Sequence, residues 1–126
     1  MATFNGNGPL TFSICIGDLY SFFNSSDSLT APVFSRVACI QQAGPGVRGV
    51  RQFAINFASA PTSVVKIFGS NNAPTAAGPD PNGFLLYTST NTQNDQYEDG
   101  AAYQFYWVEL VSKSGGGALT VTMKQV

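Results

Sequence analysis

Short segments in which large apolar side chains alternate with polar or small ones constrain this chain more than any other feature. In Gln52–Gly69 the alternation runs on both sides of a turn at Ser59–Thr62. The apolar members are Phe53, Ile55, Phe57, Val65 and Ile67. A spacing of two places such side chains on one face of a β-strand. We therefore predict a hairpin here, with Pro61 in the turn because proline cannot donate to a strand ladder.

Six further segments have the same alternation or a strongly β-prone composition. They are Leu10–Ile16, Leu19–Phe23, Val33–Gln41, Gly83–Thr90, Tyr103–Val111 and Ala118–Val126. Connections rich in Gly, Pro and Asn separate them, and no helical period of convincing length appears. This pattern predicts an all-β fold, an antiparallel β-sandwich or jelly roll of about seven or eight short strands.

The run Tyr103–Val111 is apolar on both faces, which is typical of a central strand. Trp107 lies in the middle of this run between large apolar residues, so we expect it in the core rather than on a ligand-stacking surface. Ser70–Asn82 and Asn91–Ala102 are rich in polar residues and turn formers, and we predict loops at both places.

The domain organisation follows from length and from the N-terminal composition. A chain of 126 residues has the size of one domain. Residues 1–9 are rich in Gly and Asn, with Phe4 as the large apolar side chain. We expect them to be a flexible arm, either a disordered terminus or a segment that Phe4 anchors on a partner, and we expect residues 10–126 to form a single β-sandwich domain.

The charge content excludes several classes of protein. Charged residues make up 10% of the chain, against about 25% in an average globular domain, and the formal net charge is −1. The six basic residues are scattered, so we expect no binding to nucleic acid. No apolar stretch is long enough to cross a bilayer, and we expect no membrane association.

The chain lacks the usual groups for catalysis. It contains no histidine. Cys15 and Cys39 lie in apolar, strand-like segments, so we expect two buried thiols, with a disulfide between them as the alternative. They are too far apart in sequence, and lack the companion ligands, for a zinc site. The acidic residues of the 91–102 loop do not follow the spacing of a calcium loop, and we interpret them as solvated. We therefore predict no enzymatic activity, no catalytic residue, no metal and no cofactor.

Two groups of residues are candidates for binding. The first is a partner surface formed by aromatic side chains that we expect to exceed what the core absorbs: Phe4, Tyr20, Phe22 and Phe23. The second is a ligand loop of the kind that sugar-binding β-sandwiches present, formed by Asn94, Asp95 and Tyr97 with Gln96. Tyr87 or Tyr103 would flank this loop.

The layout from Gln52 to Val126 resembles that of small structural proteins of tailed bacteriophages. The segments that carry the likeness are FASAP, VVKIFGSNN, YQFYWVELVS and ALTVTMKQ, in this order. The resemblance implies a virion component made in the host cytoplasm, most simply a decoration or cement protein that binds and stabilises a capsid. Its partners would be the major capsid protein or other virion proteins, and it would form a homo-oligomer, with a trimer favoured. The alternative is a carbohydrate-binding β-sandwich module, in contact with a host receptor if it belongs to a virion.

Overall fold

The computed structural model describes residues 11–14, 19–40, 50–75, 78–101 and 103–125. For 11–14 it describes the backbone alone. The described residues form ten strands and no helix. The strands are β1 (Thr11–Ile14), β2 (Leu19–Phe23), β3 (Val33–Phe34), β4 (Val37–Ile40), β5 (Arg51–Phe57), β6 (Pro61–Ser70), β7 (Phe84–Thr90), β8 (Asn94–Asp99), β9 (Phe105–Gly115) and β10 (Leu119–Gln125).

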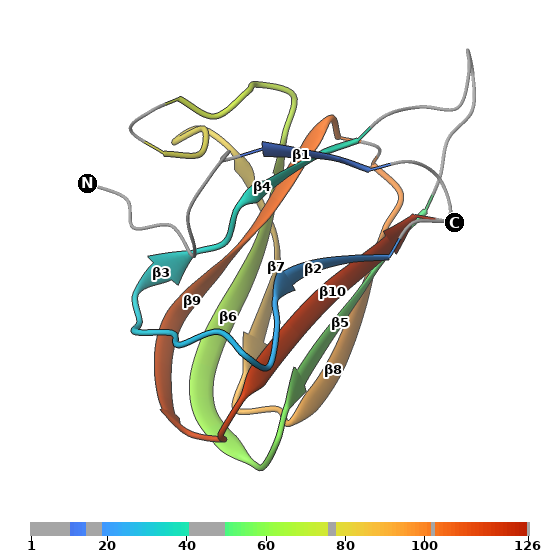
Figure 1. The fold of residues 1–126 in the computed structure, drawn as a ribbon. Helices are drawn as coiled ribbons and strands as arrows, with labels where there is room; N and C mark the ends of the chain where they lie inside the picture. Colours follow the sequence, from blue (N-terminus) through green and yellow to red (C-terminus); the bar gives the residue numbers. More distant parts are fainter. Residues whose placement is uncertain (1–10, 15–18, 41–49, 76–77, 102, 126) are drawn as a thin grey trace.

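The strands form two sheets that pack face to face as a β-sandwich (Figure 1). One sheet has the order β1-β4-β9-β6-β7, with the short β3 also paired to β9. The other has the order β2-β10-β5-β8. Apart from the parallel pair β1–β4, the pairings between described strands are antiparallel. The predicted all-β sandwich is therefore confirmed, with ten strands instead of seven or eight.

The core lies between the sheets and is built from alternate residues of the long strands. In β5, β6 and β10 every second side chain is buried, as the alternation in the sequence predicts. β9 runs between β6 and β3/β4, so it is the central strand that its two apolar faces predict. Buried members of the core include Phe53, Ile55, Phe57, Val65, Ile67, Tyr106, Val108, Leu110, Leu119, Val121 and Met123.

The predicted hairpin over Gln52–Gly69 is wrong. β5 pairs with β10 and β8, and β6 pairs with β9 and β7, so the two strands belong to opposite sheets. Pro61 is not in the turn but begins β6. Two strands that face one core from opposite sides show the same alternation as two paired strands, so the pattern could not distinguish these arrangements.

The chain passes from one sheet to the other twice at this end of the sandwich, first from β5 to β6 and again from β9 to β10. Gly115–Gly117 make this crossing with φ angles of 69°, 81° and 68°, which glycine adopts without steric cost. The two crossings are hydrogen-bonded to each other, because the N–H of Ser59 donates to the carbonyl of Gly116 over 2.9 Å. A Cβ atom on Gly116 would lie 2.8 Å from Cβ of Pro61, so the close approach requires glycine here.

Trp107 is buried, as predicted, but on the outer side of its sheet. Its ring stacks on Phe68 with centroids 5.6 Å apart, and 2% of the residue is exposed. The loop that follows β6 covers it, and a Cβ atom on Gly83 would lie 2.4 Å from the indole ring. Asp80 holds this loop to the end of β6, because its carboxylate accepts a 2.6 Å hydrogen bond from Ser70 Oγ.

Two other expectations need correction. The predicted loop Asn91–Ala102 contains β8, whose six residues pair with β5. The predicted strand Val33–Gln41 is divided into β3 and β4 at Ser35, whose hydroxyl accepts the N–H of Val108. The predicted arm, residues 1–9, lies outside the described residues.

Candidate functional site

The open edge formed by β7 is the surface that stands out on this sandwich. β7 ends its sheet, with β6 as its one strand neighbour among the described residues. Phe84 and Leu85 at its start are 59% and 50% exposed. The strand contains no charged residue and no proline, which are two of the devices that keep a sheet edge from pairing with another strand. Its pairing with β6 does contain one register shift, between Ile67 and Phe68. We call Phe84–Thr90 the β7 edge.

The ladder between β6 and β7 shows which backbone groups this edge presents. The N–H of Asn91 donates to the carbonyl of Ser63, and the register continues through Ser89 opposite Val65. In an antiparallel ladder, alternate residues turn their N–H and C=O groups toward the neighbouring strand. Thr88 and Thr90 lie between the bonded positions, so their backbone groups point outward from the edge.

A strip of aromatic rings lines the same side of the sandwich, between β7 and β8. Tyr87 and Tyr97 stack across the two sheets with centroids 4.9 Å apart. Phe84 stacks on Tyr103 at 5.5 Å. Tyr103 lies over Gly69, where a Cβ atom would approach its ring to 2.6 Å. Apart from the exposed Phe84, these rings are half-buried, which is typical of side chains that present one face to a partner.

Asp95 is the polar group of this strip, and its carboxylate is already engaged. Tyr87 Oη donates to Asp95 Oδ2 over 2.6 Å, and this hydrogen bond is the main reason that the pKa of Tyr87 is raised. Desolvation acts to raise the pKa of Asp95, but hydrogen bonds from Tyr87, Ser89 and the N–H of Gln96 outweigh it and lower that pKa. Asp95 therefore stays ionised and fixed between the two sheets.

A second carboxylate, Asp99, is buried at the end of β8. It lies opposite Arg51 in the ladder between β8 and β5. Tyr106 Oη donates to Asp99 Oδ2, and Tyr97 Oη donates more weakly to Oδ1 over 3.4 Å. Burial first, and the bond to Asp99 second, raise the pKa of Tyr106. The arrangement joins β8 to β9 across the sandwich.

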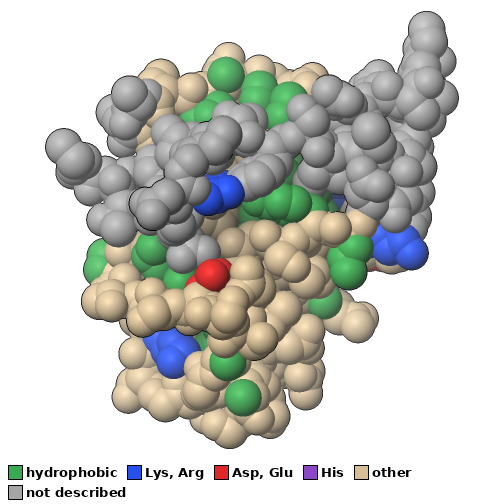
Figure 2. All heavy atoms as spheres, viewed as in Figure 1, with side chains coloured by type: hydrophobic (Ala, Val, Ile, Leu, Met, Phe, Trp, Pro, Cys, Tyr) green, Lys and Arg blue, Asp and Glu red, His purple; other side chains and the backbone are tan. Residues whose placement is uncertain are grey.

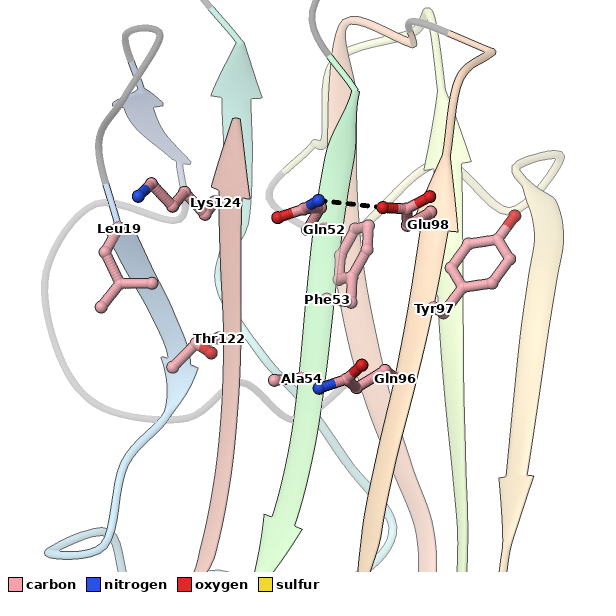
Figure 3. A pocket seen from close by; sticks show the side chains of 9 residues that line it. All are labelled: Leu19, Gln52, Phe53, Ala54, Gln96, Tyr97, Glu98, Thr122 and Lys124. Carbon is pink, nitrogen blue, oxygen red and sulfur yellow. Dashed lines mark hydrogen bonds between the residues drawn. The ribbon is translucent and has the colours of Figure 1, made fainter. Parts of the chain in front are cut away.

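The outer face of the β2-β10-β5-β8 sheet carries a shallow depression of about 250 Å³ (Figure 3). Lys124, Gln52 and Glu98 form a row across it, in which Gln52 Nε2 donates to Glu98 Oε1 over 2.9 Å. Ala54 makes the hollow because its neighbours have longer side chains. The Phe53 ring belongs to the core, so it gives this depression no face on which a sugar could stack.

Of the predicted partner residues, Tyr20, Phe22 and Phe23 lie on β2 and Phe4 lies outside the described residues. Phe22 and Phe23 are 3% and 0% exposed, so the expectation that they form an exposed patch is wrong. Both fill the core beside β10. Tyr20 is half-buried against Phe22, and burial raises its pKa.

The predicted ligand residues lie on a strand rather than on a loop. Asp95 and Tyr97 point between the sheets toward Tyr87, whereas the exposed Asn94 alternates with them and points away. The structure thus brings Asp95 and Tyr97 together with the two flanking tyrosines, but it does not add Asn94 to them. Sequence reasoning missed Phe84 and Leu85, although the uncharged run FLLYTST was the available signal.

The charge pattern of the surface matches the low charge content of the chain. Figure 2 shows a face on which charged side chains are few and isolated. In the described part of the chain no cluster of three or more His, Cys, Asp or Glu residues is arranged to hold a metal ion. The described residues also include no helix that is long and apolar enough to span a membrane.

Comparison with known proteins gave no relative. A scan against protein-family models, a search of curated proteins and a search of solved structures each returned no match.

Proposed function

We propose that this protein is a non-enzymatic structural component of a virion, most simply a decoration or cement protein that binds and stabilises a phage capsid. The observation that carries the proposal is the β7 edge. It is an uncharged strand with an open backbone and with the large apolar side chains Phe84 and Leu85 exposed. Soluble proteins rarely leave such an edge open unless other protein covers it.

The strand order supports the same proposal. β2-β10-β5-β8 faces β4-β9-β6-β7, and the chain passes between the sheets in the manner of a jelly roll. Viral capsid domains use this architecture, and so do lectins, so the fold agrees with the proposal without selecting it. The low-charge surface agrees with it as well, because charged groups are depleted where protein interfaces are buried.

Carbohydrate binding is the second candidate, because Asp95 and Tyr97 lie together with Tyr87 as that hypothesis requires. The hydrogen bonds and ring contacts of these residues favour the structural role over sugar binding. Asp95 already accepts hydrogen bonds from Tyr87 and Ser89, and one face of Tyr97 is stacked on Tyr87. A sugar would have to replace bonds that are satisfied within the chain, whereas a protein partner can pack on the strip as it stands.

Co-sedimentation with phage capsids tests the proposal, beside a glycan array with the same preparation. We expect saturable binding to shells and no response on the array. Since the contact depends on apolar area more than on charge, it should persist at high salt. A glycan signal that disappears in Tyr97→Ala, together with no binding to any shell, would overturn the proposal and favour the second candidate.

A further inference from the structure

We infer that the β7 edge is a self-association surface, at which β7 of one subunit pairs antiparallel with β7 of a second copy of this chain. The two sheets would then continue into each other across a twofold axis. The inference deepens the proposed function and rests on it for treating this edge as an assembly surface. It replaces the trimer implied by the resemblance with a twofold dimer.

The backbone of the β7 edge determines the shape of its partner. Thr88 directs its N–H and C=O groups outward, and Thr90 directs its N–H outward while its carbonyl accepts a 3.0 Å hydrogen bond from Thr92 Oγ1. Another extended strand can satisfy such a row of backbone groups. The strand has seven residues, longer than the average of five to six for strands in globular proteins. It is therefore long enough to support a ladder with a strand of equal length.

The side chains of this edge make a second copy an acceptable partner. A twofold axis at Thr88 sets each residue opposite the one equally far beyond Thr88 in the partner, so a charge near the centre of the strand would lie close to a like charge. The β7 edge carries none. β8, the edge of the other sheet on this side, carries Asp95, Glu98 and Asp99, and self-pairing there would bring carboxylates together.

We place the twofold axis of the proposed dimer at Thr88. Paired residues that exchange hydrogen bonds must both point outward, and this axis meets the condition because it sets Thr88 opposite Thr88 of the partner subunit. β-branched pairs of this kind suit antiparallel strands. Leu85, half exposed in the single chain, then lies beside the far end of the partner's strand, which covers part of its apolar surface.

The other edges described are less suited to the same role. β2 has five residues, against seven in β7. The charges of Arg36 and Asp27 act on its Tyr20, so that edge is bordered by charged groups. β1 has four residues and is joined to its sheet by a parallel pairing.

Analytical ultracentrifugation of the full chain over a wide range of concentration tests the inference. We expect a monomer–dimer equilibrium. Thr88→Lys should raise the dissociation constant of the dimer on the order of tenfold or more, because it sets two ammonium groups opposite each other. Asn56→Lys, which adds the same charge to an exposed position on the central strand β5, is the matched control and should leave the equilibrium unchanged.

Two further variants distinguish strand pairing from a general loss of stability. An equimolar mixture of Thr88→Lys and Thr88→Asp should recover the dimer, because opposite charges then face each other. Thr88→Pro removes an outward N–H that the ladder with β6 does not use, so the chain should fold, as circular dichroism can check, and should remain monomeric.

A wild-type chain that is monomeric throughout, or that forms trimers, would overturn the inference, as would a dimer that Thr88→Lys leaves intact. The result is independent of the capsid assay. A monomer that sediments with shells would refute the inference and support the proposed function. A dimer that binds no shell would support the inference and count against the proposed function.

Discussion

Two tyrosine hydroxyl groups add hydrogen bonds between the sheets to the apolar core that packs them together. Tyr106 is fully buried, and its hydroxyl donates to Asp99 and accepts the N–H of Tyr103. Tyr87 donates to Asp95 across the sandwich. The Tyr106 hydroxyl gives partners to polar groups in a buried site, so this tyrosine stabilises the fold more than its apolar area alone implies.

Tyr106→Phe should lower the free energy of unfolding by about 1–3 kcal/mol, because it leaves the buried Asp99 carboxylate and the N–H of Tyr103 without this partner. Tyr97→Phe is the matched control, since Tyr97 is half-buried and its bond to the same carboxylate is 3.4 Å long. Tyr97→Phe should lower the free energy of unfolding clearly less than Tyr106→Phe does. Urea denaturation of both variants measures the difference, and equal losses would contradict the role assigned to Tyr106.

Asp95 should make the stability depend on pH in the acid range. Its pKa in the folded chain is lowered from 3.8, so its stabilising contribution is complete above that value and is lost as pH falls through the lower folded pKa. Tyr87→Phe removes one of the hydrogen bonds that lower this pKa. We expect the loss of stability between pH 5 and pH 2 to be smaller in the variant, on the order of a few tenths of a kcal/mol or more. Parallel pH-dependent curves for both proteins would refute this.

At the scale of elements, the loop between β6 and β7 acts as a cover for the outer side of its sheet. Gly83 lies against the Trp107 indole ring, and Asp80 fastens the loop to Ser70. The hydrogen bond from Ser70 is the main cause of the lowered pKa of Asp80, with a further bond from the N–H of Asn82. The loop therefore shields Trp107, whose side chain points away from the core, from solvent.

Gly83→Ala should displace this loop, because the added Cβ would lie 2.4 Å from a rigid ring that cannot yield. We expect a loss of about 1–3 kcal/mol and a red shift of fluorescence, which reports on Trp107 alone because it is the single tryptophan. Gly100→Ala is the control, because nothing lies within 4 Å of the added atom, and it should change neither the stability nor the emission maximum. An unchanged emission maximum in Gly83→Ala would show that the loop does not cover the ring.

The elements also show how far the sequence predicts this fold. Alternation correctly predicted the inward faces of β5, β6 and β10, because a half-buried strand must repeat every second residue. It did not predict that β5 and β6 lie in opposite sheets. The hydrophobic pattern of a strand shows which face is buried but not which strand it pairs with. β8 was predicted as a loop because nearly all of its residues are polar. Its inward-pointing side chains find their partners, such as Tyr87 for Tyr97, only once the two sheets have come together.

The candidate site was harder to predict for the same reason. Asp95 and Tyr97 were selected from the sequence, but their contact with Tyr87 depends on two sheets meeting at one side of the sandwich. The prediction that Phe22 and Phe23 exceed the core is wrong because the sequence does not show how much volume two facing sheets enclose. The β7 edge could be recognised only once the strand order was known.

At the scale of the whole molecule, the described residues form a sandwich with few surface charges and one long uncharged edge. Such a chain can work by burying surface against neighbours, at about 25 cal/mol for each Å² of apolar surface removed from water. Self-pairing at β7 would add to this, because a dimer with two shell contacts on a symmetric capsid gains avidity that a monomer lacks. The proposed function and the proposed dimer therefore support each other while remaining separately testable.

Electron cryomicroscopy of phage capsids incubated with the purified protein is the decisive experiment for the proposed function. We expect regular extra density on the outside of the shell, into which the sandwich fits with its β7 edge turned toward a second copy. Shells that remain bare at saturating protein concentration, across capsids from related phages, would contradict the claim that this chain is a capsid-binding virion component.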